Sequence, residues 1–406
     1  MSKRLRKRTL FAKSLFASEL PAGWRLVTVG DVLTGAEYGL SAPGDSEGDT
    51  PIVGMRDINN GSVSVVNLAT INGSANDWSK LRLRVGDILL NRTNSPDLVG
   101  KVGIVREDSH AVFASYLVRL NINRKTVDAE YLNAWLNGAI AQKALKRLST
   151  RGVSQANINP TEFQRHCPLP LPELTEQQEI ARILRTWDKA IEKVDRLIGL
   201  VTKQRSAVCQ GIFESDYAAG GSLLRAREIF MPVSERARPD LPLLAVMQDI
   251  GIVRRDELDR RVTMPEGDTS TYKVVRPGDF VISLRSFEGG LEYSSITGLV
   301  SPAYTVLRPT RPICAEYYRH FFKSRSFIGR LDRMIFGIRD GKQIAFRDFG
   351  DMFIPYPRIE DQEHHERALG TAERLIEVNL RKKQAFESQK RGLMQKLLTG
   401  EWRLPC

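Results

Sequence analysis

Basic, amide and hydroxyl side chains gather in short loops at matching places in the two halves of the chain. Arg and Lys can hydrogen-bond guanine O6 and N7, Gln and Asn can hydrogen-bond adenine N6 and N7, and Ser, Thr and Lys can hold phosphates. This mixture predicts contacts with DNA bases and backbone; the alternative is a set of polar loops that meet only solvent. The candidates in the first half are Arg92, Thr93, Asn94, Arg151, Ser154, Gln155 and Asn157, and those in the second half are Arg285, Ser286, Arg339, Lys342 and Gln343.

The sequence lacks the spacings that known catalytic centres require. Gly341-Lys342-Gln343 has neither the hydroxyl nor the glycine spacing of a phosphate-binding loop, and no Gly-x-Gly-x-x-Gly opens a helix. Asn94-Ser95-Pro96-Asp97 only partly matches the Asn-Pro-Pro-aromatic loop of amino-methyltransferases. It lacks the second proline and the aromatic residue that would stack on a flipped base. His166-Cys167 and His364-His365 have no third ligand at metal-binding spacing, and Asp340 is only half of a nuclease centre. We therefore predict no catalytic residue and no metal site; the rival interpretation is a nuclease or methyltransferase that acts alone.

Composition and charge fit a globular protein with a polyanionic partner. The chain has 406 residues, which is too long for one core, so two or more domains are expected. Lys and Arg number 60 against 48 Asp and Glu, an excess that suits DNA. The cysteines show no metal or disulfide spacing, and neither a secretory signal nor a membrane span is evident, so we expect a cytoplasmic protein.

The chain repeats itself with a period of about 190 residues, and such a period indicates a duplicated structural unit. Four short segments recur in the same order in both halves, which makes chance agreement a poor explanation. Arg84 to Leu89 recurs as Arg276 to Val281, Ser115 to Val118 as Ala303 to Val306, Ala129 to Tyr131 as Ala315 to Tyr317, and Pro170 to Pro172 with Gln177 as Pro355 to Pro357 with Gln362.

Each half has the same expected plan of a globular part, a Pro-x-Pro segment and a long helix. Residues 88–90 and 280–282 are apolar runs after a Gly-Asp turn, which predicts buried strands. Residues 129–148 and 315–331 are predicted to be amphipathic helices. The Pro-x-Pro segments must be extended because proline cannot continue a helix.

Two heptad seams predict that the long helices pair as a coiled coil. Apolar residues alternate at steps of four and three, interrupted only at Arg205 in the first seam. The second seam carries polar members such as Asn379, which would fix the register of the pair at some cost in stability. The alternative is that each helix packs only on its own globular part; an antiparallel pair would bury both seams. The residues expected to pair are Leu184, Trp187, Ile191, Val194, Ile198, Ile376, Phe386 and Leu393, in seams that continue through Val201, Val208 and Ile212 and through Leu369, Lys383, Lys390 and Leu397.

With these residues in place, the chain resembles the specificity subunits of type I restriction–modification enzymes. The resemblance covers nearly the whole chain from Leu20 onward. The motifs that carry it are Leu20-Pro21-Ala22-Gly23-Trp24, Val85 to Leu89, Gly152 to Ile158, Pro168 to Gln177, Val275 to Val281, Ser301 to Pro309 and Gly337 to Gly341. The second half lacks the Leu-Pro-x-Gly-Trp opening and begins differently, over residues 223–252, so we expect the halves to read different sequences.

The resemblance implies an α/β (α+β) architecture: two target-recognition domains of mixed α/β structure joined by two long antiparallel helices that form a coiled coil. We expect a basic N-terminal arm over residues 1–19, recognition domains over 20–172 and 216–357, and spacer helices over 173–215 and 358–402. It also implies that the chain recognises a bipartite site in double-stranded DNA and docks methyltransferase subunits, and that restriction–translocase subunits can join. S-adenosylmethionine, ATP and Mg would then be held by the partner subunits, with no cofactor in this chain. A coiled-coil scaffold that does not bind DNA is the third interpretation.

Overall fold

The computed structural model divides the chain into two compact units, which are described separately. Unit 1 comprises Met1–Val194 and Lys382–Cys406, and unit 2 comprises Asp195–Arg381. Because each unit takes part of both long helices, the division does not follow the boundaries of the five segments expected from sequence. The structure describes residues 20–41, 48–73, 78–152, 155–218, 223–248, 250–258, 269–284, 286–335 and 344–404.

The globular part of unit 1, here called the first head, runs from β1 to β14 and is built on a six-stranded sheet of order β2-β11-β7-β9-β5-β4. Smaller sheets pair β1 with β14, β10 with β3 and β6, and β12 with β13 and β8. The strands are β1 (Arg25–Thr28), β2 (Leu33–Tyr38), β3 (Thr50–Val53), β4 (Ile58–Asn59), β5 (Ser62–Val63), β6 (Ala69–Ile71), β7 (Ile88–Asn91), β8 (Thr93–Asn94), β9 (Val102–Ile104), β10 (Val112–Phe113), β11 (Leu117–Ile122), β12 (Ser149–Arg151), β13 (Ala156–Ile158) and β14 (Pro168–Leu171). The helices are α2 (Ala129–Asn137), α3 (Ala139–Leu148) and α4 (Pro160–His166), with short 3₁₀ turns η1 (Val29–Val32) and η2 (Met55–Asp57).

The globular part of unit 2, the second head, runs from β15 to β24 around a four-stranded sheet of order β16-β23-β20-β21. Two-stranded sheets pair β15 with β24, β17 with β18 and β19 with β22. The strands are β15 (Leu223–Arg225), β16 (Phe230–Val233), β17 (Leu244–Met247), β18 (Gly251–Arg254), β19 (Lys273–Val275), β20 (Phe280–Ile282), β21 (Glu292–Tyr293), β22 (Gly298–Val300), β23 (Thr305–Pro309) and β24 (Phe353–Pro355). The helical elements are α6 (Ala226–Ile229), η3 (Arg255–Glu257), α7 (Ser286–Gly289), α8 (Ala315–Phe322), α9 (Arg325–Ile335) and α10 (Phe346–Asp351).

The two heads share one core topology, which supports the internal repeat. The order β2-β11-β7-β9 in the first head matches β16-β23-β20-β21 in the second, and β1 pairs with β14 as β15 pairs with β24. The strands expected at 88–90 and 280–282 are β7 and β20, and both are buried. The Pro-x-Pro segments are extended as expected, in β14 and β24.

The repeated Gly-Asp turn has the same structural role in both heads. Gly86 and Gly278 have φ of +88° and +91°, a left-handed conformation that favours glycine. The carboxylate of Asp279 accepts hydrogen bonds from the Arg308 guanidinium at 2.8 and 2.7 Å, and the Arg119 guanidinium donates to Asp87 at 3.1 Å. These motif residues therefore stabilise the heads rather than face a ligand.

The single helices expected over 129–148 and 315–331 are each two helices. Gly138 separates α2 from α3 with extended angles of φ −73° and ψ 155°, and Lys323 and Ser324 separate α8 from α9. The apolar period continues across each break, so the pattern alone did not reveal it. The break lets the second helix of each pair turn away from the first.

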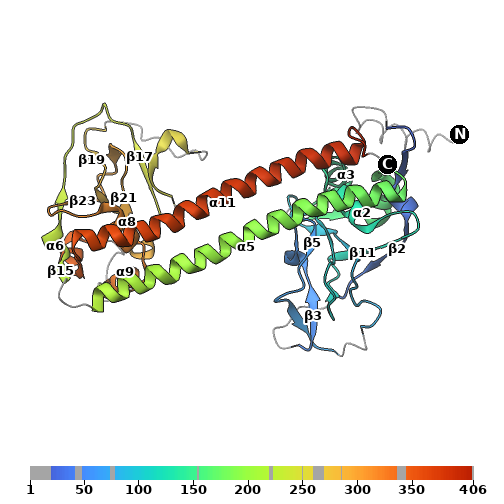
Figure 1. The fold of residues 1–406 in the computed structure, drawn as a ribbon, viewed down its shortest axis with the longest axis horizontal. Coiled ribbons are helices and arrows are strands. Elements are labelled where there is room, and N and C mark those ends of the chain that lie inside the picture. Colours follow the sequence, from blue (N-terminus) through green and yellow to red (C-terminus); the bar gives the residue numbers. More distant parts are fainter. Residues whose placement is uncertain are drawn as a thin grey trace. The chain divides into compact units, whose positions relative to one another are not determined.

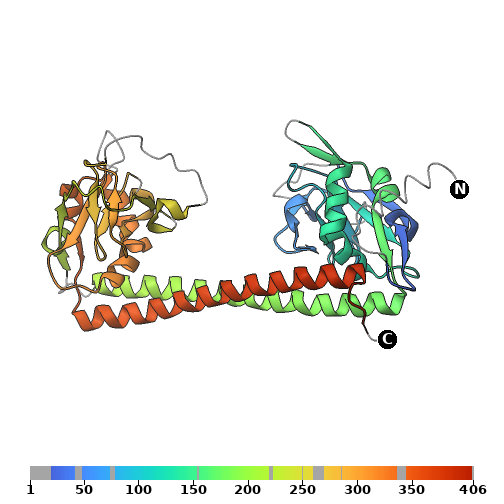
Figure 2. The same ribbon diagram turned by 90° about the horizontal axis from the view of Figure 1, so that it is seen from above.

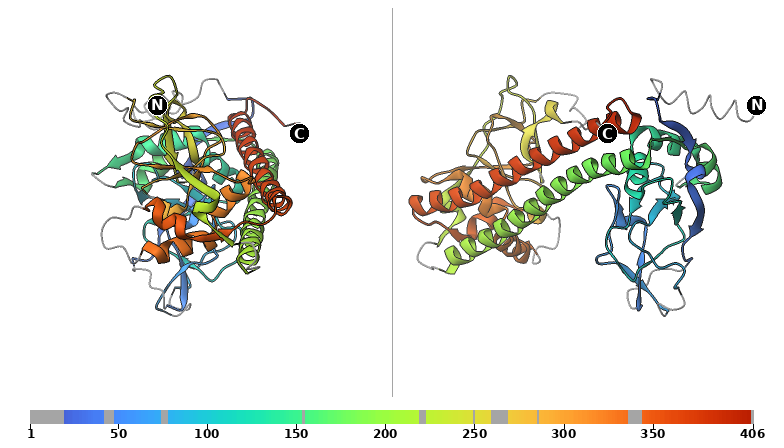
Figure 3. Two further views of the ribbon diagram at one scale, coloured as in Figure 1. Left: turned by 90° about the vertical axis from the view of Figure 1, so that its left-hand side faces the viewer. Right: turned by 45° about the vertical axis from the view of Figure 1, so that its right-hand side comes forward.

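The two long helices pair antiparallel, as predicted. They are α5 (Leu174–Ala218) and α11 (Ile359–Thr399). In unit 1, Trp187 of α5 meets Phe386 of α11 edge to face at a centroid distance of 5.6 Å, and the last turns of α11 lie beside the first turns of α5 (Figures 1 and 2). In unit 2, Arg205 of α5 pairs with Glu373 of α11, and the two segments lie side by side in Figure 3.

The predicted seam is buried at some positions and half-buried at most others. Leu184 and Val194 of α5 are buried, as are Leu369 and Leu397 of α11. Two details differ from expectation. Val208 is 40% exposed, because beyond Arg205 the contacts pass to Phe213, which is fully buried among the aromatic rings of unit 2. The remaining pairing residues Trp187, Ile191, Ile198, Ile376, Phe386 and Leu393 are half-buried.

Candidate nucleic-acid interface

A three-stranded sheet in the first head brings its candidate residues together. β13 lies between β12 and β8, with Thr150 opposite Asn157 and Asn157 opposite Thr93. The loops around 92–94 and 149–157 are therefore one surface, although they are about 60 residues apart in the chain. Arg151 lies in β12 opposite Ala156, and Asn94 lies in β8, also opposite Ala156.

The outward face of this small sheet carries a row of hydroxyl and amide groups. Ala156 and Ile158 are buried on the inner face, so the alternation along β13 points Asn157 outward. The Thr93 hydroxyl donates to Asn157 Oδ1 at 2.7 Å, and the Thr150 hydroxyl donates to the Asn157 carbonyl at 3.1 Å. The Thr93 hydroxyl thus holds the exposed side-chain amide of Asn157, and an amide held in this way can pair with the donor and the acceptor of an adenine edge.

The turn between β12 and β13 presents Gln155. Its carbonyl accepts a hydrogen bond from the Gly152 amide at 2.7 Å, which closes the turn, and its side chain is exposed. Ser154, in the same turn, lies outside the described residues. A glutamine at the tip of a hairpin is well placed to reach a base edge or a phosphate.

Arg92 and two exposed tyrosines extend the surface beyond the sheet. The Arg92 guanidinium lies over the Tyr38 ring at 5.1 Å from its centroid and donates from Nε to the Ser115 carbonyl at 3.3 Å. The Arg92 amide donates to the Tyr116 carbonyl, and Tyr38 and Tyr116 are both about half exposed. A cation beside exposed aromatic rings is common at nucleic-acid surfaces. Neither tyrosine was predicted from the sequence to contact DNA, although Tyr116 lies inside a repeated segment.

Some of the basic residues of the first head are neutralised internally. Arg119 donates to Glu37 and to Asp87, and its hydrogen bond to Glu37 lowers the pKa of that carboxyl. Such an arginine cannot also neutralise a phosphate without losing these partners. The total of 60 basic residues therefore overstates the number of cations that are free to contact DNA, although such pairs leave the net charge unchanged.

The candidates of the second half fare differently. Ser286 is 1% exposed, and its hydroxyl accepts a hydrogen bond from the Ser283 amide at 2.7 Å at the start of α7. This side chain therefore serves the local turn, and we withdraw it as a DNA contact. Arg285, Arg339, Lys342 and Gln343 lie outside the described residues. Residues 336–343 stand between α9 and α10, the same chain position that the hairpin β12–β13 has between α3 and α4.

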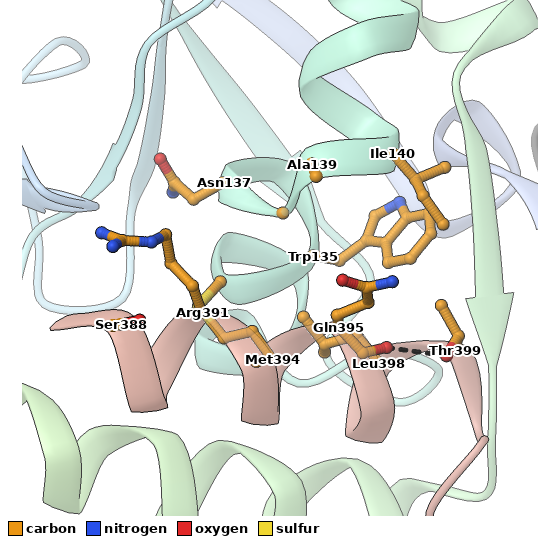
Figure 4. A pocket seen from close by; sticks show the side chains of 12 residues that line it. Trp135, Asn137, Ala139, Ile140, Ser388, Arg391, Met394, Gln395, Leu398 and Thr399 are labelled. Atoms are coloured by element: carbon orange, nitrogen blue, oxygen red, sulfur yellow. Dashed lines mark hydrogen bonds between the residues drawn. The ribbon is translucent and has the colours of Figure 1, made fainter. Parts of the chain in front are cut away.

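Unit 1 also contains an apolar groove of about 500 Å³ (Figure 4). Trp135, Ala139 and Ile140 line it from the junction of α2 and α3, and Met394 and Leu398 line it from α11. At the equivalent place in unit 2, Phe213 fills the space and meets the rings of Tyr317 and Phe321 edge to face at 5.4 Å. The groove suits an apolar side chain.

A profile of the type I restriction modification DNA specificity domain matches residues 21–200. The putative type I restriction enzyme MjaX specificity subunit of Methanocaldococcus jannaschii is 23% identical over 407 residues, which cover 95% of this chain and 95% of that protein. The EcoBI specificity subunit of Escherichia coli is 25% identical over 209 residues, 49% of this chain and 43% of that protein. The chain is thus similar to the specificity subunits of type I restriction–modification enzymes, and residues 21–200 match their DNA specificity domain.

Solved structures agree with this specificity-subunit fold. The S subunit of a type I restriction–modification system from M. genitalium superposes with a TM-score of 0.58 at 14% identity, covering 94% of this chain and 98% of the other. A chain from a structure that describes complex assembly and conformational transition of the type I system superposes with a TM-score of 0.53 at 18% identity, covering 95% and 100%. These two structures therefore support the fold of the chain.

No group of three or more His, Cys, Asp or Glu side chains is arranged to hold a metal ion within the described part of the specificity subunit. Over the same residues, no helix is long and apolar enough to cross a membrane. Among the described residues, the features that could contact a ligand include the polar surface of the first head, the groove and the exposed faces of the long helices.

Proposed function

We propose that this specificity subunit reads a bipartite DNA site, with one head on each half-site, and docks methyltransferase subunits that carry the chemistry. The observation that carries the proposal is the duplication: two heads with one core topology, each followed in the chain by a long helix that pairs with the other. At about 1.5 Å per residue, a helix of 45 residues is about 68 Å long, which exceeds one turn of DNA. Paired helices of that length suit a spacer between two half-sites.

In this proposal the chain itself is not catalytic. The polar surface around Asn157 and Gln155 offers base-edge and phosphate contacts but groups no acid, base and nucleophile. S-adenosylmethionine, ATP and Mg belong to the partner subunits, which include restriction–translocase subunits where the system has them, and the assembly acts on DNA in the cytoplasm. A methyl-transfer or nuclease activity in the purified chain alone would favour the rival interpretation.

An exposed apolar face on the paired helices supports the docking of partner subunits. Leu200 of α5 and Val378 of α11 are each 59% exposed, and each lies one position before a seam residue. Since Arg205 pairs with Glu373, the antiparallel register puts Leu200 level with Val378 and on the same side of the helix pair. Leu197 and Leu375 extend this patch. Exposed leucine and valine side chains at helical spacing commonly form the binding site for another helix.

The decisive experiment is methylome sequencing of cells with and without the gene. We expect one bipartite methylation motif to disappear with the gene, and the motif names both half-sites. DNA binding that is absent, or that does not weaken as salt rises, would favour a coiled-coil scaffold instead.

The loops supply a prediction about base discrimination. Replacing Gln155 or Arg339 with alanine should cost about 1–3 kcal/mol at one base position if these side chains make bidentate base contacts. The measurement is the methylation rate on a panel of single-base variants of the site, with Gln178→Ala, an exposed glutamine on α5, as the control. An equal fall in methylation rate on all sequences would assign these side chains to phosphate contacts. An unchanged methylation rate would show that the loops contact only solvent.

Modularity of the heads gives a second prediction. Exchanging residues 20–165 for the corresponding segment of another specificity subunit should change one half-site and leave the other unaltered, because each head has its own core. Methylome sequencing of the hybrid reads both half-sites at once. A simultaneous change of both half-sites would contradict independent reading.

A further inference from the structure

Each head packs on the long helices through its apolar core, and polar contacts add to that packing. The first of two such polar attachment points is a buried glutamine. Gln177 Nε2 donates to the Pro172 carbonyl at 2.9 Å and the Thr126 carbonyl at 3.1 Å, and its Oε1 accepts from the Asp128 amide at 2.9 Å. Gln362 repeats this arrangement, with Nε2 donating to the Pro357 carbonyl at 2.8 Å and Oε1 accepting from the Cys314 amide at 2.9 Å. Each glutamine ties the start of its long helix to the start of a helix in the head.

The second point is a junction of four charged side chains. In unit 1, Lys390 of α11 pairs with Asp188 of α5, and the head residue Arg106 lies 4.0 Å from Asp188 and donates to Glu130 of α2 at 2.7 Å. These four side chains are called the first junction. Arg106, Asp188 and Lys390 are largely buried, so solvent screens their attraction little.

Unit 2 contains the equivalent junction with the roles of the helices exchanged. Arg205 of α5 pairs with Glu373 of α11, and the head residue Arg319 donates to Glu373 at 2.6 Å and also pairs with Glu316 of α8. Burial works to raise the pKa of Glu373, but the hydrogen bond from Arg319 and the surrounding cations outweigh it, so this pKa is lowered. The carboxylate is therefore ionised at neutral pH.

The duplication relates three of the four charges of one junction to those of the other. Asp188 follows Gln177 by eleven residues and Glu373 follows Gln362 by the same number, and the same shift relates Arg205 to Lys390. Arg205 and Lys390 therefore occupy equivalent positions of the two heptad seams. Only the head cation differs in position, since Arg106 follows β9 while Arg319 lies in α8.

Two attachment points fix an angle where one does not. Eleven residues of helix separate each glutamine from its junction, a lever of about 16 Å. The apolar core and the glutamine hold the head near the start of its long helix, and the junction adds charged contacts farther along that helix and ties the second helix to the first. Asn379, the seam residue expected to set the register, donates to the Leu375 carbonyl of its own helix instead.

We propose that the two junctions are positioning devices that hold each head at one angle on the paired helices, and so make the complex accept one spacer length. The inference rests on the proposed function, because a spacer exists only if the site is bipartite. A half-site displaced by one base pair lies about 3.4 Å farther away and is rotated about the DNA axis, so a rigidly held head meets it only if the DNA deforms.

The test removes both partners of each helix-to-helix pair in the full methyltransferase complex. The variants are Asp188→Leu with Lys390→Leu, and Arg205→Leu with Glu373→Leu. Arg106 keeps Glu130 and Arg319 keeps Glu316, so no charge is left buried alone, and leucine in a seam often leaves stability unchanged or raised. The control is Glu377→Leu with Arg381→Leu, an exposed pair within α11.

Methylation is measured on sites with the native spacer and with spacers one base pair longer and shorter, beside the melting temperature. For the wild type and the control we expect off-length sites to be methylated at below about one tenth of the native rate. For the junction variants we expect off-length rates within about threefold of the native rate, with half-site discrimination and melting temperature retained. Conservative replacement of Asp188 by Glu with Lys390 by Arg should restore the strict spacer.

Other outcomes separate the inference from the proposed function. Junction variants that fold and still require the native spacer length overturn the inference. Junction variants whose half-site discrimination falls together with their melting temperature overturn it as well. If the leucine variants do not fold, Asp188→Asn with Lys390→Gln, which keeps size and polarity, must relax the spacer in their place. A wild type without any bipartite motif defeats the proposed function itself.

Discussion

Inserting one heptad into each long helix should move the accepted spacer by about three base pairs. Seven residues lengthen a helix by about 10 Å, and successive base pairs are about 3.4 Å apart. Duplicating residues 191–197 in α5 and 376–382 in α11 preserves both seams, because a whole heptad repeats the pattern that buries Ile191 and Ile376. Methylation at the original spacer should fall by about 100-fold or more, since a displaced head loses the base contacts of its half-site.

The new spacer should be methylated more slowly than the wild type methylates its own. Three base pairs also turn one half-site by about 100° around the DNA axis, while a heptad turns the head by much less, so the DNA must twist to restore both contacts. A four-residue insertion in α5 alone is the control, because it breaks the seam and should abolish activity on every spacer. Methylome sequencing reads the outcome. An unchanged spacer in the heptad variant would show that the helices do not set the distance.

The seams could be predicted because a coiled coil is specified by local spacing. The steps of four and three that include Leu184 and Trp187 continue far enough to identify the face, and burial in the structure follows that face. The same reasoning treated Arg205 as an interruption and Asn379 as the register residue. The heptad pattern could not show that Arg205 pairs with Glu373 and Lys390 with Asp188 on the other helix. Such partners depend on the register of the two helices, which neither helix specifies alone.

The heads were predicted less completely because their contacts join distant segments. Thr93 bonds to Asn157, 64 residues away, and no local pattern specifies that β8 joins the hairpin of β12 and β13. Gly138 ends α2 although the apolar period runs on. Its extended angles are open to any residue, but a Cβ at this position would lie 3.0 Å from the Trp135 carbonyl oxygen, so the close approach favours glycine. Ser286 looked like a phosphate contact by residue type, and only its burial shows the local role.

The opening of the second head shows that packing can be kept while residues change. The Leu-Pro-x-Gly-Trp motif of the first head is absent from the second, yet β15 and α6 take the places of β1 and η1. In the first head, Trp24 donates to the buried Glu176 at 3.0 Å, and Arg403 bonds to the same carboxylate. In the second, Tyr317 donates to Asp216 at 2.6 Å beside His365, so a different acid ties the head to the helix ends.

Charging the exposed apolar face should release the methyltransferase subunits. In Leu200→Glu with Val378→Glu, two carboxylates replace side chains that are more than half exposed, so the isolated chain should keep its fold and melting temperature. In the complex the same carboxylates would be buried without a partner, which costs at least about 3 kcal/mol. We therefore expect the Kd for the methyltransferase subunit to rise by about 150-fold or more.

Two controls separate loss of docking from loss of folding or of DNA binding. Lys203→Glu changes an exposed residue of α5 away from the apolar face, and it should leave the Kd for the methyltransferase subunit within about threefold. Salt-dependent DNA binding by the isolated double variant should equal that of the wild type, because the polar surface of the first head lies on other elements. Undiminished methylation by the double variant in cells would place the docking face elsewhere on the chain, and the groove between α2, α3 and the end of α11 would then be the next surface to charge.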